Sequence, residues 1–150
     1  MDTNQRQPAQ PEIPSEIRGL PRDKCWQLVR DSLVGRLAVV HDDAPDIFPV
    51  SFVVDHGTVV LRTAAGTKHD SARNRIVAFE VDGYDLDTAE AWSVVLRGRA
   101  TEVYAMDEAI EIMNLPLSPW APGSKPHLLR ITPDVVTGRR FVIHGGEPRA

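Results

Sequence analysis

The spacing of apolar residues changes once along this chain, near residue 35. Before that point apolar positions recur every three or four residues, which is the period of a helix with one buried face. The pattern predicts a helix over about Arg22 to Leu33, with Asp23 as its N-cap and Gly35 as the residue that stops it. The residues of its apolar face are Cys25, Trp26, Leu28, Val29 and Leu33.

From residue 35 onward, short apolar and β-branched runs alternate with turn residues, which is typical of strands. The predicted strands cover residues 35–41, 47–55, 58–63, 75–82, 91–104, 127–133 and 138–144. His56 and Gly57 between two of them predict a tight hairpin turn. A second helix is expected at about Met106 to Asn114. This order of elements predicts a mainly β fold, a small antiparallel β-barrel with flanking helices.

Residues 91–104 carry the clearest strand signal. Alternation with a period of two places one set on a buried face: Trp92, Val94, Leu96, Gly98 and Ala100. The other face receives Ser93, Arg97, Arg99 and Thr101, with Val95 as the exception. Gly98 inside a strand predicts a bulge, which would help the sheet to curl. Pro49 cannot donate a ladder hydrogen bond, so its strand is expected to have an edge or a bulge there, open to a ligand.

Composition narrows the class of protein. Residues 1–20 are rich in proline, glutamine and charge and predict a disordered or loosely docked tail, whereas 21–150 predict one folded domain. The formal net charge of −4 argues against nucleic acid or an anionic membrane as the main partner, but it allows a local basic pocket. There is no apolar run of about 18 residues and no signal-peptide core, so a cytoplasmic location is expected. The single cysteine, Cys25, excludes an internal disulfide and is expected to be buried.

The stretch Arg62–Asp70, RTAAGTKHD, is the main candidate for chemistry. It could be a metal site, a phosphate site or a solvated loop. The metal interpretation is weak, because His69 and Asp70 are adjacent and the other histidines show no i, i+4 pair. A phosphate would find a forked donor in Arg62, a charge in Lys68 and hydroxyls in the threonines. No serine lies in a G-x-S-x-G elbow, so a nucleophilic hydrolase is not indicated.

An ordered set of short motifs favours the phosphate interpretation. These are G-R-L-A at 35–38, P-V-x-F at 49–52, x-T-x-x-G-x-K at 62–68, W-S-V at 92–94 and G-x-A at 98–100. In this order the chain resembles the flavin-binding split barrels of the pyridoxamine 5'-phosphate oxidase-like superfamily, over roughly Arg22 to Arg140. The resemblance implies a six-stranded antiparallel split barrel. It also implies a homodimer with flavin mononucleotide (FMN) in two clefts at the subunit interface.

The same resemblance assigns cofactor-binding positions. By position, the phosphate segment corresponds to Thr63, Ala64, Thr67 and Lys68, with Arg62 as a helper. The strand against the flavin ring corresponds to Pro49, Val50 and Ser51. Trp92 and Ser93 correspond to a strand that approaches the ring, in many members from the other subunit. Two alternatives stay open: Trp92 as a core residue, and Trp120 either as a cover for the substrate side of the ring or as an ordinary surface residue.

These considerations lead to an expected function. We expect an FMN-dependent oxidoreductase that transfers hydride to an unknown small substrate, with no catalytic residue assigned and no metal. The alternatives are a flavin-binding protein without turnover and a deazaflavin-dependent reductase. The chain lacks the C-terminal segment that supplies arginine and histidine to a substrate phosphate in true pyridoxamine phosphate oxidases. Phosphorylated vitamin B6 is therefore not the expected substrate.

Overall fold

The computed structural model describes residues 17–63, 67–103 and 127–144, and for residues 67–69 the backbone alone. The elements in order are β1 (Ile17–Gly19), α1 (Arg22–Arg30), β2 (Val34–His41), β3 (Ala44–Asp55), β4 (Thr58–Thr63), α2 (Thr67–Ala72), β5 (Arg75–Asp85), β6 (Glu90–Glu102) and β7 (His127–Val142). The predicted helix at 106–114, Trp120 and most of the tail lie outside the described residues. No helix in the described segments is long and apolar enough to cross a membrane.

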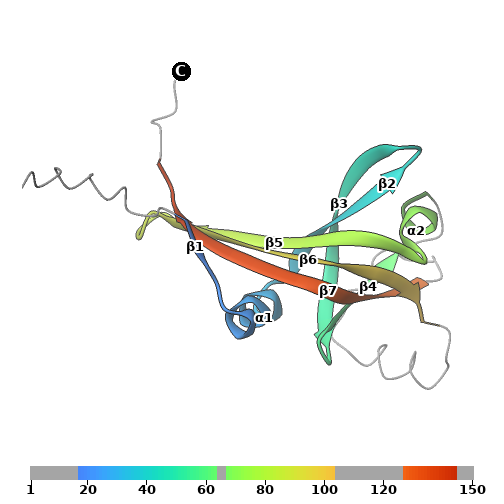
Figure 1. The fold of residues 1–150 in the computed structure, drawn as a ribbon, viewed down its shortest axis with the longest axis horizontal. Coiled ribbons are helices and arrows are strands. Elements are labelled where there is room, and N and C mark those ends of the chain that lie inside the picture. Colours follow the sequence, from blue (N-terminus) through green and yellow to red (C-terminus); the bar gives the residue numbers. More distant parts are fainter. Residues whose placement is uncertain (1–16, 64–66, 104–126, 145–150) are drawn as a thin grey trace, which may run out of the picture.

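The strands form one antiparallel sheet that closes on itself. Neighbours follow the order β1-β7-β4-β3-β2-β5-β6, and β6 also pairs with β7. Strands β2 to β7 therefore make a closed six-stranded barrel, and the predicted barrel is confirmed. Figure 1 shows the long strands β5, β6 and β7 running together, with α1 beside β7 and α2 near the ends of β2 and β5. β1 is a short addition to β7, which attaches the end of the N-terminal tail to the barrel.

Strand β7 corrects the sequence interpretation. Residues 127–133 and 138–144, predicted as two strands, belong to a single strand of 16 residues. The turn-like residues between them are accommodated by a bulge, because Gly98 pairs with Pro133 whereas Arg97 pairs with Val135, leaving Asp134 as the extra residue. A side chain on Gly98 would lie 2.0 Å from the Thr132 carbonyl oxygen. The bulge predicted at Gly98 is thus confirmed, with the extra residue on the partner strand.

Helix α1 is shorter than predicted. It begins after Pro21, which is its N-cap without a side-chain hydrogen bond, so the prediction of Asp23 as N-cap is wrong. Asp23 lies in the first turn, where its negative charge favours the helix. The helix ends at Arg30, and Leu33 is 81% exposed. Gly35 is not a helix stop: it lies in β2, where a Cβ would sit 2.3 Å from the Phe79 ring.

The proline in β3 lies where the sequence predicts an edge. β2 pairs with β3 along its whole length, with Arg36 opposite Pro49. On the other side, β4 pairs with β3 only from Phe52 to Asp55. Within the described residues Pro49 therefore has a strand on one side only, and the missing N–H breaks no ladder there.

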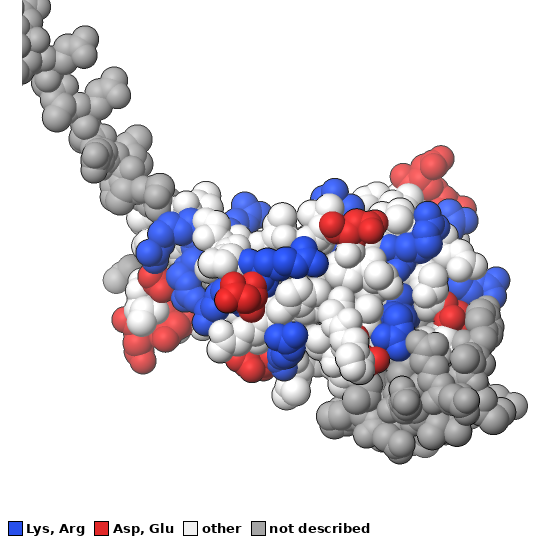
Figure 2. Space-filling view, turned by 60° about the horizontal axis from the view of Figure 1, so that its bottom comes forward, with Lys and Arg blue, Asp and Glu red and all other residues white. Residues whose placement is uncertain are grey.

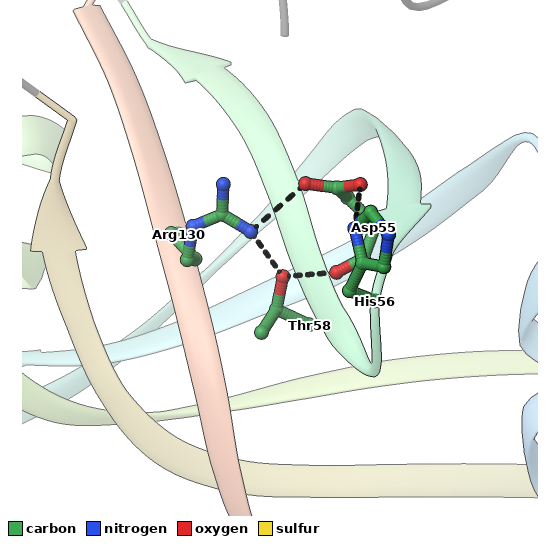
Figure 3. Close-up of polar contacts among 4 residues, drawn as sticks. All are labelled: Asp55, His56, Thr58 and Arg130. Carbon is green, nitrogen blue, oxygen red and sulfur yellow. Dashed lines mark hydrogen bonds and ion pairs between the residues drawn. The ribbon is translucent and has the colours of Figure 1, made fainter. Parts of the chain in front are cut away.

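The β3–β4 hairpin is fastened to β7 at its tip. His56 and Gly57 both have positive φ, as a two-residue type I′ turn requires. Arg130 of β7 reaches this tip: its Nη1 donates to Asp55 Oδ2 (3.1 Å) and to Thr58 Oγ1 (2.6 Å). Thr58 Oγ1 in turn donates to the Asp55 carbonyl (2.6 Å), and the imidazole of His56 hydrogen-bonds Asp55 Oδ1 (Figure 3). These contacts fix the register of the strands that close the barrel.

Alternation along the strands fills the barrel interior. The largest fully buried side chains are Phe79, Leu37, Leu61, Leu96, Leu129, Ile131, Val29, Val59, Val60, Val81 and Val94. Phe52 and Phe79 meet edge to face at 4.8 Å in this core. In β6, Val94, Leu96 and Ala100 are fully buried, which confirms the predicted face. Cys25, also fully buried, packs from α1 into the same core, as predicted.

Candidate functional site

Three of the residues assigned to the cofactor lie where β3 and β4 part. The last paired residues of these strands at this end are Phe52 and Leu61, which point into the core. Ser51 and Arg62 come next on the two strands and therefore point outward. Pro49 shares the outward phase with Ser51. The fold thus brings Pro49, Ser51 and Arg62 together on the outer surface, at the open edge of β3.

Arg62 is suited to an anion in this place. Its Nε atom is buried and has no hydrogen-bond partner among the described residues. A buried donor without a partner costs roughly 1–3 kcal/mol, which a phosphate oxygen would recover as a charge-assisted hydrogen bond. Beside it, Val60 and Leu128 form a small buried apolar cluster, with Val53 and Val103 packed against them. An arginine with an unused donor fits the phosphate of a cofactor.

The other residues that the resemblance assigns to the phosphate and the ring either point inward or have side chains outside the described residues. Val50 and Thr63 are each 3% exposed, with side chains in the inward phase, so only their backbone faces a ligand on the outer surface. Ala64 lies outside the described residues, as do the side chains of Thr67 and Lys68, whose backbone begins α2. α2 has six residues, so few peptide dipoles add up at its N-terminus to attract an anion.

Trp92 and Ser93 line a hollow on a different part of the barrel. This hollow has a volume of about 620 Å³, and we call it the β5–β6 hollow. Its walls include Glu80, Asp82, Tyr84, Trp92, Ser93 and Phe141. The Trp92 indole lies against the backbone of Gly83, where a Cβ would come within 2.7 Å of the ring, and it also packs on the core. Ser93 borders a second, smaller hollow of about 250 Å³.

The two groups are not joined within one chain. Pro49, Ser51 and Arg62 lie on β3 and β4, whereas Trp92 and Ser93 lie on β6, with β2 and β5 between on one side of the closed barrel. On the other side only β7 lies between, but Arg62 pairs with Leu128 near one end of β7 and Trp92 pairs with Arg140 near the other. Three strand-to-strand steps of about 4.8 Å place β3 roughly 14 Å from β6 along the curved sheet. The residues that the resemblance assigns to one cofactor are therefore divided between two places on the surface.

Between these groups lies a charged cluster that the sequence analysis missed. Arg36 on β2 pairs with Glu80 on β5, and its Nη1 lies 3.8 Å from Glu80 Oε1 and 3.4 Å from Asp82 Oδ1. We call these residues the Arg36–Glu80–Asp82 cluster. Burial raises the pKa of Glu80 to about 7, helped by its hydrogen bond to Asp82 and that residue's negative charge, against the opposing effect of Arg36. Glu80 and Asp82 on alternate positions of a strand were the available signal, but only the register shows that Arg36 faces them.

Metal binding and nucleophilic hydrolysis can each be compared with the described side chains. Among the described residues there is no group of three or more side chains that could hold a metal ion. His41 Nδ1 lies 3.1 Å from Ser71 Oγ and its Nε2 lies 3.3 Å from Asp42, which has the composition of a hydrolytic triad. Ser71 is only 6% exposed, so its hydroxyl is not accessible to a substrate. The contact joins α2 to β2 instead.

The charge distribution is mixed. In the view of Figure 2, cationic and anionic side chains are interspersed with uncharged surface. This agrees with the small net charge of −4. Such a surface can bind a single phosphate at one arginine, such as Arg62. It offers less to a long polyanion, which would need a continuous basic track.

Comparisons with known proteins identify the family and the fold. A family model described as pyridoxamine 5'-phosphate oxidase matches residues 21–140. The structure of an FAD-binding protein from Mycobacterium smegmatis has 38% sequence identity and a TM-score of 0.77, covering 84% of this chain and 99% of that one. A conserved protein of unknown function from Corynebacterium diphtheriae has 37% identity and a TM-score of 0.75, covering 85% and 99%. An uncharacterized protein of Mycobacterium tuberculosis is 30% identical over 146 residues, 93% of this chain and 95% of its own.

The family match covers all six strands of the closed barrel except the last residues of β7. The solved relatives at 37–38% identity share the same fold over nearly their whole length. The chain therefore belongs to the pyridoxamine 5'-phosphate oxidase family and has its split-barrel fold.

Proposed function

We propose that this protein binds a flavin nucleotide and acts as a flavin-dependent oxidoreductase. The observation that carries the proposal is Arg62, whose buried Nε lacks a partner on the surface beside Pro49 and Ser51. Membership of the family and a relative that is an FAD-binding protein support it. A flavin needs an apolar slot with polar edges and an anchor for its phosphate, and Arg62 at the open edge of β3 would supply the anchor.

The proposal includes a second copy of the chain. The two groups of assigned residues are divided on one surface, and two copies related by a two-fold axis would bring the Arg62 group of each to the Trp92 group of the other. Large apolar side chains on the outer face of β2, β3 and β5 would be covered in such a dimer. They are Val34, Val40, Ile47 and Ile76, each between 50% and 63% exposed.

In this proposal each residue has a limited task. Arg62 and Lys68 hold the phosphate, Pro49 leaves the strand edge open to the ring, and Trp92 and Ser93 close the ring's other side from the partner. The bound flavin supplies reversible hydride transfer, so the chain itself need not provide a strong acid or base. The apolar walls would exclude water from the reacting face.

The proposal also ranks the flavins that the protein could bind. FMN is our first choice, because Arg62 and Lys68 provide for one phosphate. FAD is the alternative suggested by the M. smegmatis relative, and a deazaflavin remains a third candidate. FMN, FAD and phosphorylated deazaflavins share a planar ring and a phosphate, so the same residues would serve each of them.

The test starts from the visible spectrum of the purified protein and from titration with FMN, FAD and a deazaflavin. We expect Arg62→Gln to weaken flavin binding by about 1–3 kcal/mol, the scale of a hydrogen bond to a charged group. Arg30→Gln, at an exposed position on α1, is the matched control and should leave the affinity unchanged.

Three results would contradict the proposal in different ways. A colourless protein that no flavin reconstitutes would remove flavin binding altogether. Equal affinities of the Arg62→Gln and Arg30→Gln variants would move the phosphate site elsewhere. A flavin-loaded protein that is not bleached by nicotinamide nucleotides under anaerobic conditions would leave binding in place and favour the alternative without turnover.

A further inference from the structure

The Arg36–Glu80–Asp82 cluster lies between the two halves of the proposed site. Pro49, Arg36, Glu80 and Val95 follow one another across β3, β2, β5 and β6 in the pairing register. If two copies exchange the Arg62 and Trp92 groups reciprocally across the exposed apolar side chains of β2, β3 and β5, the strip between the groups on that side of the barrel lies near the two-fold axis. The cluster of one copy would then face the cluster of the other. This inference rests on the dimer of the proposed function.

The charged groups around Glu80 are few. On β2 it faces Arg36, and on its own strand Asp82. On β6 its partner is the uncharged Val95, and the next charged residue on that face is Arg97, opposite Ala78. Across the β5–β6 hollow, Arg139 of β7 shares the lining with Glu80. The described part of α2 approaches β2 at its other end, where Ser71 contacts His41.

The charge of the cluster depends on one proton. With Glu80 protonated, Arg36 and Asp82 balance and the cluster is neutral. With Glu80 ionised, the cluster carries one net negative charge, and Oε1 is a buried acceptor without a hydrogen-bond partner among the described residues. Two such clusters facing each other would combine like-charge repulsion with loss of solvent, and both oppose ionisation.

We propose that the outer strip of β2 and β5 is a self-contact whose formation takes up protons at the Arg36–Glu80–Asp82 cluster. The dimer is then tight in acidic solution and weakens as the pH rises. In one copy the pKa of Glu80 is already raised to about 7, and covering the cluster raises it further. Association is therefore fully favoured below about pH 7 and is lost as the pH rises through the higher value in the dimer.

The experiment is sedimentation of the full chain, flavin-loaded and flavin-depleted, over a concentration series from pH 6 to 9. For the wild type we expect the association constant to fall by about tenfold or more between pH 6.5 and 8.5, because each copy loses up to one proton. Glu80→Gln should associate tightly with little change over this range. Glu90→Gln is the matched control: Glu90 lies at the start of β6 and pairs with Arg18 and Arg140. It should keep the wild-type pH dependence.

Three other results would each overturn a different part of the inference. A wild-type dimer whose association constant is the same at every pH, or rises with pH, overturns the proton link and leaves the dimer. Equal pH dependence in the wild type and Glu80→Gln overturns the assignment to Glu80. A chain that is monomeric at all pH values and concentrations overturns the dimer, and with it this inference, whereas flavin binding by the monomer would still stand on its own titration. Circular dichroism of each variant excludes misfolding as the cause.

Discussion

At the scale of single residues, environment rather than residue type decides what each side chain can do. Arg62 and Arg130 both lie on the strands that close the barrel. The Nη1 of Arg130 fastens the β3–β4 hairpin through Asp55 and Thr58, whereas no side-chain nitrogen of Arg62 makes a hydrogen bond or ion pair with a described residue. The first arginine has a structural task, and the second has a donor available for a ligand.

Glu80 gives a residue-scale prediction for stability. Its pKa is raised to about 7 in the fold from the ordinary value of 4.5, so folding disfavours its ionised form. That cost is absent well below pH 4.5 and grows as the pH rises to about 7. We expect Glu80→Gln to raise the free energy of unfolding by about 1 kcal/mol at pH 8, a value reduced for partial solvent exposure, with little effect at pH 4.5.

The measurement is urea denaturation at concentrations where the chain is monomeric. Asp85→Asn, at the exposed end of β5, serves as the control and should show no such pH-dependent gain. An equal effect of Glu80→Gln at both pH values would show that the pKa of Glu80 is not raised in the fold.

The sequence predicts the roles of residues that depend on local patterns, but not of those that depend on contacts between strands. Alternation along one strand correctly separates Trp92 and Val94 from Ser93 and Arg97. The motif order locates the segment around Arg62. Neither reveals the Arg36–Glu80–Asp82 cluster, because Arg36 and Glu80 are 44 positions apart and meet only through the β2–β5 register. Cross-strand partners come from tertiary structure, and a single sequence does not encode the pairing locally.

At the scale of elements, glycine and proline explain both the correct and the wrong predictions. Gly35 looks like a helix stop, but it is needed in β2 so that the Phe79 ring can lie against the backbone. Pro133 and Gly138 look like the ends of two strands, but the bulge at Asp134 absorbs the irregularity within β7. Local turn signals were overridden here by pairing with β6, which extends along almost the whole of β7.

The bulge leads to an element-scale prediction. Gly98→Ala would place a Cβ 2.0 Å from the Thr132 carbonyl oxygen and 2.7 Å from Pro133 Cα, and both are backbone atoms that cannot turn away. We expect a loss of about 2–4 kcal/mol in the free energy of unfolding, at or above the usual range for overpacking. Gly19→Ala is the matched control, because nothing lies within 4 Å of its added Cβ. Thermal and urea denaturation of the two variants measure the difference, and similar stabilities would mean that β6 and β7 do not cross closely at the bulge.

At the scale of the whole molecule, closure of the barrel determines what one copy can bind. The strand order and register separate the Arg62 group from the Trp92 group, by β2 and β5 on one side of the barrel and by most of the length of β7 on the other, whatever the side-chain rotamers are. The resemblance predicts which positions belong to the cofactor. The sequence cannot show that they lie apart on one chain, because that follows from the order of strands in the sheet.

A shared site leads to a prediction for mixed dimers. Arg62→Gln damages one half of the site, and Ser93→Tyr would fill the other half at the hollow. In a dimer with one subunit of each variant, one site carries both changes and the other carries neither. We expect such heterodimers, isolated through two different tags after co-expression, to bind about one flavin per dimer with wild-type affinity, whereas both sites of each homodimer bind more weakly. Heterodimers with no site of wild-type affinity, from subunits that fold normally, would mean that each site lies within a single chain.

The corner where α1 meets β7 gives the protein a chemical reporter of its own. Cys25 is the single cysteine of the chain, and its side chain is fully buried. Its Sγ lies so close to Gly138 that a Cβ there would be 2.5 Å away, and burial raises the pKa of the thiol. A thiol reagent therefore reacts only with molecules in which α1 has lifted from the sheet. The rate of labelling in the native protein counts these opening events directly, without an introduced probe.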